Sequence, residues 1–229
     1  MMKFRLWCVA AAAVMLMSSV AAAQVLLYDM EGAPPPSGFG PNGFPPPTIT
    51  QDTIGATGGS TNSMKYFAPN DATFTGALTT VVPAALSSPA GVQSILLDLT
   101  IGQGEAYTGA FSDIGITIFG YKGMSFGIPV QFAATQPIGG RTAGTYSDLS
   151  FSLGQSVQPG PTFGKSFNQI FLGGILDGVT GFQVYQAKSA DAPSTIYIDN
   201  IRAVVPEPAT GALLGLGAIA LGLVARRRD

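Results

Sequence analysis

Apolar and polar residues alternate along much of the middle of this 229-residue chain. Within 94–101 every second residue is a branched aliphatic one, and 113–121 shows the same alternation over part of its length. A period of two places the apolar side chains on one face of an extended segment, so both segments are predicted to be strands. The residues sharing a face are Ile95, Leu97, Leu99 and Ile101 in the first segment, and Ile114, Ile116 and Ile118 in the second.

Further segments have the composition of strands and are separated by Gly, Pro, Asn or Asp. They are 25–30, 48–54, 63–68, 73–79, 126–132, 145–153, 166–172, 180–187 and 195–204. No segment between 24 and 205 keeps an apolar stripe with the 3.6-residue period of a helix. About ten short strands at this spacing predict an all-β domain over 24–205, built as an antiparallel sandwich or a barrel.

Residues 33–47 interrupt this pattern with seven prolines and three glycines. Proline cannot donate to a β-ladder, and it breaks the interior of a helix. The segment is therefore predicted to be a long surface loop.

The first 23 residues have the three parts of a secretory signal peptide. Lys3 and Arg5 form a basic start, an apolar run covers 6–17, and a small-residue step ends at Ala23. We therefore expect export with cleavage after Ala23, and an uncleaved N-terminal anchor is the alternative. The chain's one Cys, Cys8, lies in this segment, and the sequence contains no His.

A mature chain without Cys or His excludes several classes of chemistry. It can form no disulfide, thiolate nucleophile or Ser-His-Asp triad, and it lacks the nitrogen and sulfur ligands that zinc and copper prefer. Residues 24–205 carry six basic and eleven acidic residues, a net charge of −5. Because the basic residues are scattered singly, nucleic acid is not expected as a partner.

The chain ends with Val205, Pro206, Glu207 and Pro208, then a charge-free run over 209–225, then Arg226, Arg227 and Arg228. The run is just long enough to span a membrane as a helix, and the arginines would stay on the cytoplasmic side. Residues 206–229 resemble the PEP-CTERM sorting signal of Gram-negative bacteria that make exopolysaccharide. The resemblance implies transient anchoring by this helix, cleavage by an exosortase near Pro-Glu-Pro, and a cell-surface or extracellular location. An ordinary tail anchor is the alternative.

Two short motifs at the ends of the middle region are similar to those of galactose-binding-like jelly rolls, the fold of many carbohydrate-binding modules. They are "LLYDMEG" at 26–32 and "TIYIDNIRAV" at 195–204. The resemblance implies a jelly-roll sandwich with a structural calcium held by Glu31 and Asp199, with Asp29 as a further ligand, and by backbone oxygens near 59–65. Calcium takes carboxylate and carbonyl oxygens and needs neither His nor Cys. Alternatively, these acids end strands and face water.

These features favour a non-catalytic surface or matrix protein that binds a glycan, with exopolysaccharide as a candidate partner. The aromatic residues that could stack on sugars are Phe39, Phe44, Tyr66, Tyr107, Tyr121, Tyr146 and Tyr185. A purely structural or adhesive biofilm protein is the first alternative. A glycoside hydrolase is the second, but Glu31 and Glu105 are the only glutamates in 24–205, and no pair of acids has a recognisable catalytic context.

Overall fold

A computed structural model describes residues 22–32, 36–69, 73–87, 91–102, 112–189 and 193–206. Residues Gln24–Val205 form one compact unit. Nearly all of the expected signal peptide and the expected membrane helix at 209–225 lie outside the described residues. In the described ranges, no helix combines the length and the apolar character needed to cross a membrane.

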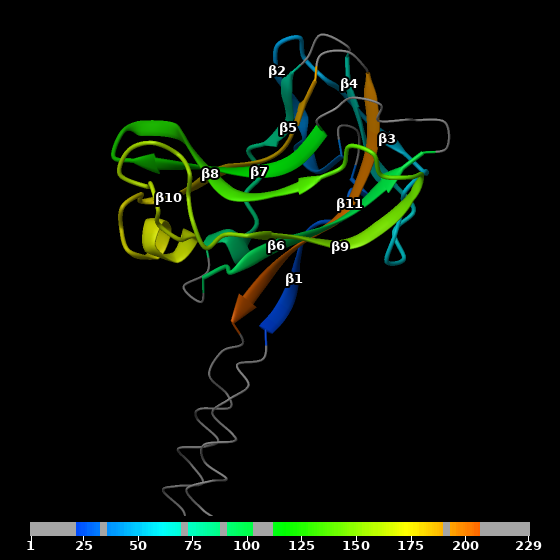
Figure 1. Ribbon diagram of the computed structural model, residues 1–229. Helices are drawn as coiled ribbons and strands as arrows, with labels where there is room; N and C mark the ends of the chain where they lie inside the picture. Colours follow the sequence, from blue (N-terminus) through cyan, green and yellow to red (C-terminus); the bar gives the residue numbers. More distant parts are fainter. Residues whose placement is uncertain are drawn as a thin grey trace, which may run out of the picture. The chain divides into compact units, whose positions relative to one another are not determined.

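The described chain forms two β-sheets that lie one over the other (Figure 1). Sheet A contains β1 (Ala22–Tyr28), β3 (Thr48–Asp52), β4 (Ser63–Ala68), β6 (Ser94–Ile101), β9 (Gly144–Ser152) and β11 (Ser194–Pro206). Sheet B contains β2 (Gly40–Gly43), β5 (Phe74–Thr79), β7 (Ser112–Lys122), β8 (Ser125–Pro137) and β10 (Gly178–Lys188). Short helical turns occupy η1 (Pro36–Gly38), η2 (Ala84–Ser87) and η3 (Asn168–Leu172).

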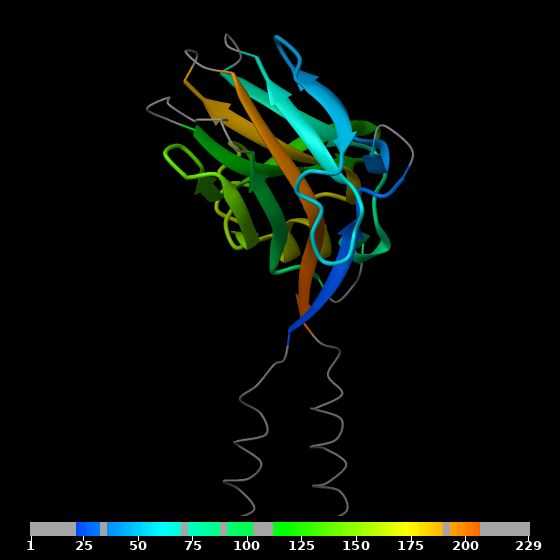
Figure 2. The ribbon, with the colours of Figure 1, turned by 90° about the vertical axis from the view of Figure 1, so that its right-hand side faces the viewer.

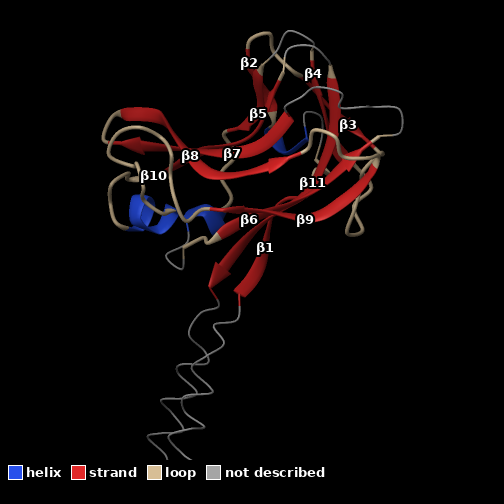
Figure 3. Ribbon diagram, in the orientation of Figure 1, coloured by secondary structure: helices blue, strands red, loops and turns tan. Residues whose placement is uncertain are grey.

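The strands follow one another in the order β3-β4-β11-β6-β9 in sheet A, where β1 also pairs with β11. The order in sheet B is β2-β5-β10-β7-β8. The strand pairs whose registers are described are antiparallel. Strands dominate the described fold, as Figure 3 shows. The prediction of an all-β antiparallel sandwich is confirmed.

The core lies between the two sheets and is built from the alternating residues of their central strands. In sheet A the predicted face of β6 is buried, and Leu99 pairs with the fully buried Ile198 of β11. In sheet B the predicted isoleucines of β7 are buried, and Ile118 and Ile116 pair with Phe182 and Val184 of β10. Since successive side chains point to opposite faces, the residues between these are directed to the outer faces of the sandwich.

The proline-rich segment differs in part from the loop that was predicted. Gly40–Gly43 forms β2, which pairs with β5 at the edge of sheet B, and Phe39 beside it is fully buried. Pro41 is tolerated there because an edge strand has a side with no neighbour to receive an N–H.

The strand predicted at 166–172 is also wrong. Helical turn η3 occupies Asn168–Leu172, and Phe167 and Ile170 are both buried. Two buried residues three positions apart fit a helical turn, whereas a strand would place them on opposite faces. Gly173 follows, and its N–H donates to Asn168 O at 2.9 Å to close the turn.

Replacement of Ile198 by alanine tests the position of the core. Ile198 is fully buried and pairs with Met64 of β4 and Leu99 of β6. Ile198→Ala should lower the free energy of unfolding by about 2–5 kcal/mol in chemical denaturation, because it leaves a cavity between the sheets. Ile54→Ala is the matched control, since Ile54 is 48% exposed, and it should change stability by about 0.5 kcal/mol. Equal losses would contradict this arrangement.

Candidate functional site

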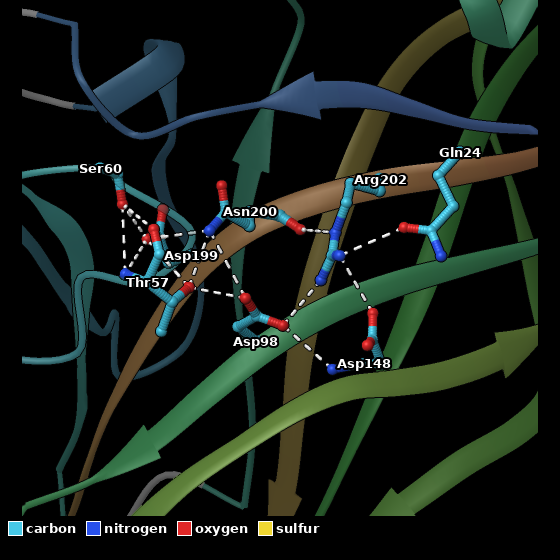
Figure 4. Close-up of polar contacts among 8 residues, drawn as sticks. All are labelled: Gln24, Thr57, Ser60, Asp98, Asp148, Asp199, Asn200 and Arg202. Carbon is cyan, nitrogen blue, oxygen red and sulfur yellow. Dashed lines mark hydrogen bonds and ion pairs between the residues drawn. The ribbon is translucent and has the colours of Figure 1, made fainter.

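Two aspartates lie opposite each other on the outer face of sheet A. Asp199 of β11 pairs in register with Asp98 of β6, while their neighbours Ile198 and Leu99 point into the core. The register shifts after Asp199, and Asn200 has a φ of 46°. This β-bulge aims the Asn200 amide back toward both carboxylates, as Figure 4 shows.

The loop between β3 and β4 covers these two carboxylates. Thr57 N donates to Asp199 Oδ2 at 2.7 Å, and Thr57 Oγ1 donates to Asp98 Oδ2 at 2.6 Å. The Ser60 hydroxyl also donates to Asp199 Oδ2 (Figure 4). Gly58 between them has a φ of 59°, and a Cβ there would lie 2.6 Å from Asn200 Nδ2. Only a glycine therefore lets the loop approach so closely. Asp98 is 5% exposed and Asp199 is fully buried.

Arg202 compensates the charge of Asp98. Its Nη2 lies 2.7 Å from Asp98 Oδ1, and its Nη1 lies 3.0 Å from Asp148 Oδ1. Arg202 Nε donates to Asn200 O at 3.0 Å, and Nη1 donates to Gln24 Oε1 at 3.2 Å (Figure 4). A buried carboxylate is stabilised only when it is paired and hydrogen-bonded, and Arg202 meets both conditions.

Asp199 has no such cationic partner in its described contacts. Its Oδ2 accepts hydrogen bonds, but its Oδ1 is one of two buried side-chain polar atoms among the described residues that lack a partner. Burial raises the pKa of Asp199, and the hydrogen bonds from Ser60 and Thr57 oppose that shift. An unpartnered, buried carboxylate oxygen suits a hard cation, so the chemistry of Asp199 fits the predicted calcium.

Glu31 reaches the same loop from its other end. Its Oε1 accepts from the Thr61 and Asn62 N–H groups, and its Oε2 accepts from Thr61 Oγ1 at 2.7 Å and Asn62 Nδ2 at 3.1 Å. Hydrogen bonds from the Thr61 hydroxyl and the Asn62 N–H lower the pKa of Glu31 to about 2. Glu31 thus binds the loop directly, with four donors already on its carboxylate.

The predicted calcium ligands are therefore only partly brought together. Glu31 and Asp199 both contact the loop at 57–62, whereas Asp29 is exposed and its Oδ1 accepts the Glu31 N–H at 3.1 Å. No group of three or more acidic, His or Cys side chains is placed to hold a metal ion within the described part of the chain. Asp199 Oδ1 is the atom through which a cation would be held.

Planar side chains lie across glycines on the outer face of sheet B. A Cβ at Gly115 would lie 2.3 Å from Cζ of Tyr185, and one at Gly76 would lie 1.8 Å from Nε2 of Gln183. Tyr121 lies over Gly178 in the same way, where a Cβ would be 2.8 Å from its ring. The absence of a side chain beneath lets each planar group lie close to the sheet.

Two ring pairs occupy this face. Phe74 and Tyr185 stack with centroids 4.9 Å apart, and Tyr121 and Phe126 stack at 5.5 Å. Phe74 is 42% exposed and Phe126 is 69% exposed. Thr117 pairs in register with Gln183, and its Oγ1 is the other buried polar atom without a partner among the described residues. The face thus combines the accessible rings of Phe74 and Phe126 with amide and hydroxyl groups that are buried, since Gln183 is 3% exposed and Thr117 is 1% exposed.

Charged groups are sparse on this face. Asp113 of β7 lies at an outward position. Burial raises the pKa of Tyr185, and the negative charge of Asp113 raises it further. Lys122 and Lys188 are the cations of the sheet B strands. Each lysine directly follows an outward-facing residue, Tyr121 or Ala187, in its strand. The side chains of both lysines therefore point away from the outer face.

The aromatic candidates from the sequence divide between core and surface. Phe39 and Tyr66 are buried in the core, whereas Tyr121 and Tyr185 lie on the outer face of sheet B. Phe44 is exposed, Tyr146 lies in sheet A beside Arg141, and Tyr107 is outside the described residues.

Sequence reasoning did not single out Phe74, Gln183, Thr117 or, on sheet A, Asp98. The sequence feature that could have identified them is their place in the alternation, because each lies at an outward position of a strand.

Comparison with known proteins agrees with the fold and identifies the C-terminal signal. Residues 204–228 match the PEP-CTERM protein-sorting motif. No curated protein sequence matches the chain.

Solved structures similar to the chain are β-sandwich modules or contain a similar region. A family 11 carbohydrate-binding module from Clostridium thermocellum, solved with a β-1,3-1,4-mixed-linked tetrasaccharide, has 13% identity and a TM-score of 0.50, over 81% of this chain and 97% of that one. An exo-β-agarase has 14% identity and a TM-score of 0.50, over 80% of this chain and 25% of the agarase. A β-sandwich superfamily carbohydrate-binding module has 14% identity and a TM-score of 0.47; this chain spans 59% of its length. At these identities, the likeness to the two structures with a TM-score of 0.50 shows the fold alone.

The Glu31 contacts predict a pH-dependent stability. Because the folded pKa of about 2 lies below the ordinary 4.5, the stabilisation is complete above pH 4.5 and is lost as pH falls toward 2. Glu31→Gln should therefore be less stable than the wild type near neutral pH, and the difference should shrink below pH 4.5. Thr61→Val, which removes one donor, should weaken the same pH dependence. Thermal melts between pH 2 and 7 measure it, and a constant difference would contradict the assignment.

Calcium binding at Asp199 is a proposal with a direct test. Binding to the folded state alone should stabilise the mature protein by about 2.7 kcal/mol at about 100 times Kd. Melting with calcium and with chelator measures this increment. Asp199→Asn should remove it, and Asp177→Asn should retain it, since Asp177 forms an exposed ion pair with Lys122. An unchanged melting temperature on chelation, with no metal found by elemental analysis, would exclude the site.

Proposed function

We propose that the chain is an exported, non-catalytic carbohydrate-binding protein of the bacterial surface or extracellular matrix. The observation that carries this proposal is the outer face of sheet B, where Tyr185 and Gln183 lie over glycines beside the accessible ring of Phe74. The PEP-CTERM motif at 204–228 supports the location. The proposal also includes a signal peptide at 1–23 and transient membrane anchoring through 209–225. It further includes processing by an exosortase in a Gram-negative host.

The chemistry of this face matches that of a sugar chain. A pyranose ring presents C–H groups on its faces and hydroxyls around its edge. Aromatic faces offer apolar contact area with a partly negative surface that favours C–H groups. Amide and hydroxyl side chains both donate and accept. Gln183 and Thr117 are 3% and 1% exposed, so they would pair with sugar hydroxyls only where the side chains over them move aside.

The glycan is expected to be uncharged. An anionic polysaccharide needs Lys or Arg for its carboxylate or sulfate groups. The two lysines of the described sheet B strands point away from this face, and Asp113 lies at its edge. The internal segments outside the described residues, 33–35, 70–72, 88–90, 103–111 and 190–192, contain no Lys or Arg in their sequences. A β-1,3-1,4-mixed-linked tetrasaccharide, with which the family 11 module was solved, is a suitable first ligand.

Binding without catalysis is favoured by the placement of the acids. Hydrolysis of a glycosidic bond normally uses two carboxylates that flank it. Asp113 is the acid at an outward position on the described strands of sheet B, while Asp98 and Asp199 are buried under the loop on sheet A. A purely structural or adhesive matrix protein is the alternative, and it predicts no glycan affinity.

Titration calorimetry of the mature protein with neutral and anionic oligosaccharides tests the proposal. Phe74→Ala should weaken binding of a neutral oligosaccharide about tenfold, since loss of one stacked ring removes roughly 0.5–1.5 kcal/mol beyond its buried area. Gly115→Ala should weaken it as well, because its Cβ would displace the Tyr185 ring.

Phe67→Ala is the matched control. Phe67 is 36% exposed on sheet A, close to the 42% of Phe74 on sheet B, and its replacement should leave affinity unchanged. Equal losses in the two variants would refute the assignment to sheet B. An absence of affinity for every glycan tested would favour the structural alternative.

A further inference from the structure

The sorting motif overlaps the last strand of the folded domain. The matched region begins at residue 204, whereas β11 continues to Pro206. Val204, Val205 and Pro206 therefore belong both to the motif and to sheet A. Pro206 is both the last residue of the strand and the first residue of Pro-Glu-Pro, and Glu207 and Pro208 follow directly in the sequence.

This end of β11 is held on both sides. Val204 pairs in register with Ser94 of β6, and its carbonyl oxygen accepts the Gln93 N–H at 2.9 Å. Val205 is 8% exposed, and Ala203 is fully buried. On the other side β11 pairs with β1, and Figure 2 shows the start of β1 beside the end of β11.

A backbone bond in such a strand is protected from cleavage. A peptidase cannot act on a bond whose own N–H and C=O groups are paired in a ladder, so it cuts such a bond only from the opened state, at a rate set by how often that state forms. The peptide bonds of Ala203, Val204 and Val205 are protected in this way. Pro206 has no N–H with which to continue a ladder, so it is a natural last residue of the protected strand.

We propose that the processing cleavage falls C-terminal to Pro206, so that the released protein keeps β11 complete through that residue. This inference rests on the exosortase part of the proposed function, and it is independent of glycan binding. The reaction breaks a backbone amide after Pro206. The acyl carbon passes to water or to an amine or hydroxyl acceptor, and the amide nitrogen becomes the amino terminus of the tail fragment.

The test uses the full chain in cells with and without exosortase, and it determines the masses of both products. The released protein should end at Pro206 or later, and the tail should begin at Glu207 or later. A released protein that ends at or before Val205, with a tail that begins at or before Pro206, would overturn this inference alone. Uncleaved chain in exosortase-positive cells would overturn both this inference and the exosortase assignment.

Gln93→Pro adds a kinetic test that leaves the motif intact. It removes the N–H that holds Val204 O, so it loosens the end of β11. Cleavage beyond Pro206 does not need that opening, and the rate and position of processing should therefore stay within about twofold of the wild type. A rise of tenfold or more, or an upstream shift of the new end, would show that cleavage occurs within the strand. Melting of the released variant checks that it folds.

Discussion

Burial of two carboxylates on one face of a sheet constrains the rest of this structure. Asp98 and Asp199 face each other across β6 and β11, where an uncompensated charge would cost several kcal/mol. Arg202 pairs with Asp98, the β-bulge brings Asn200 to both acids, and the loop after β3 supplies Thr57. The requirement to satisfy these two groups thus ties both terminal strands and a long loop to the centre of sheet A.

This constraint assigns different roles to the two outer faces. The outer face of sheet A is covered over Asp98 and Asp199, and Glu31 fastens the far end of the covering loop. Sheet B keeps its outer face for aromatic and amide side chains laid over Gly76 and Gly115. Glycine at these two positions leaves room for the side chains of Gln183 and Tyr185 to pack close against the sheet.

The sequence predicted which segments form most of the strands and which of their residues face the core, because burial of one face of a strand imposes a period of two. The isoleucines of β7 and the aliphatic face of β6 lie in the core as predicted. The alternation does not reveal which strands become neighbours. The meeting of Asp98 with Asp199 and of Phe74 with Tyr185 therefore emerged only with the sheet topology.

Local composition misled where tertiary contacts decide the conformation. Proline density predicted a loop at 33–47, but the edge of sheet B accepts Pro41 in β2. Apolar residues predicted a strand at 166–172, but burial of Phe167 and Ile170 together requires a turn of helix. The C-terminal signal was readable in full, since a sorting motif is defined by its order along the chain and needs no partner strand.

Chemical-shift mapping by NMR tests the assignment of binding to sheet B most directly. The mature protein, labelled with ¹⁵N, would be titrated with a neutral mixed-linkage tetrasaccharide. The largest shifts should fall on the backbone amides of Gly76, Gly115 and Thr117 and on the side-chain amide of Gln183, with saturation at one common Kd. Shifts confined to the loop at 57–62 and the outer face of sheet A would contradict the assignment.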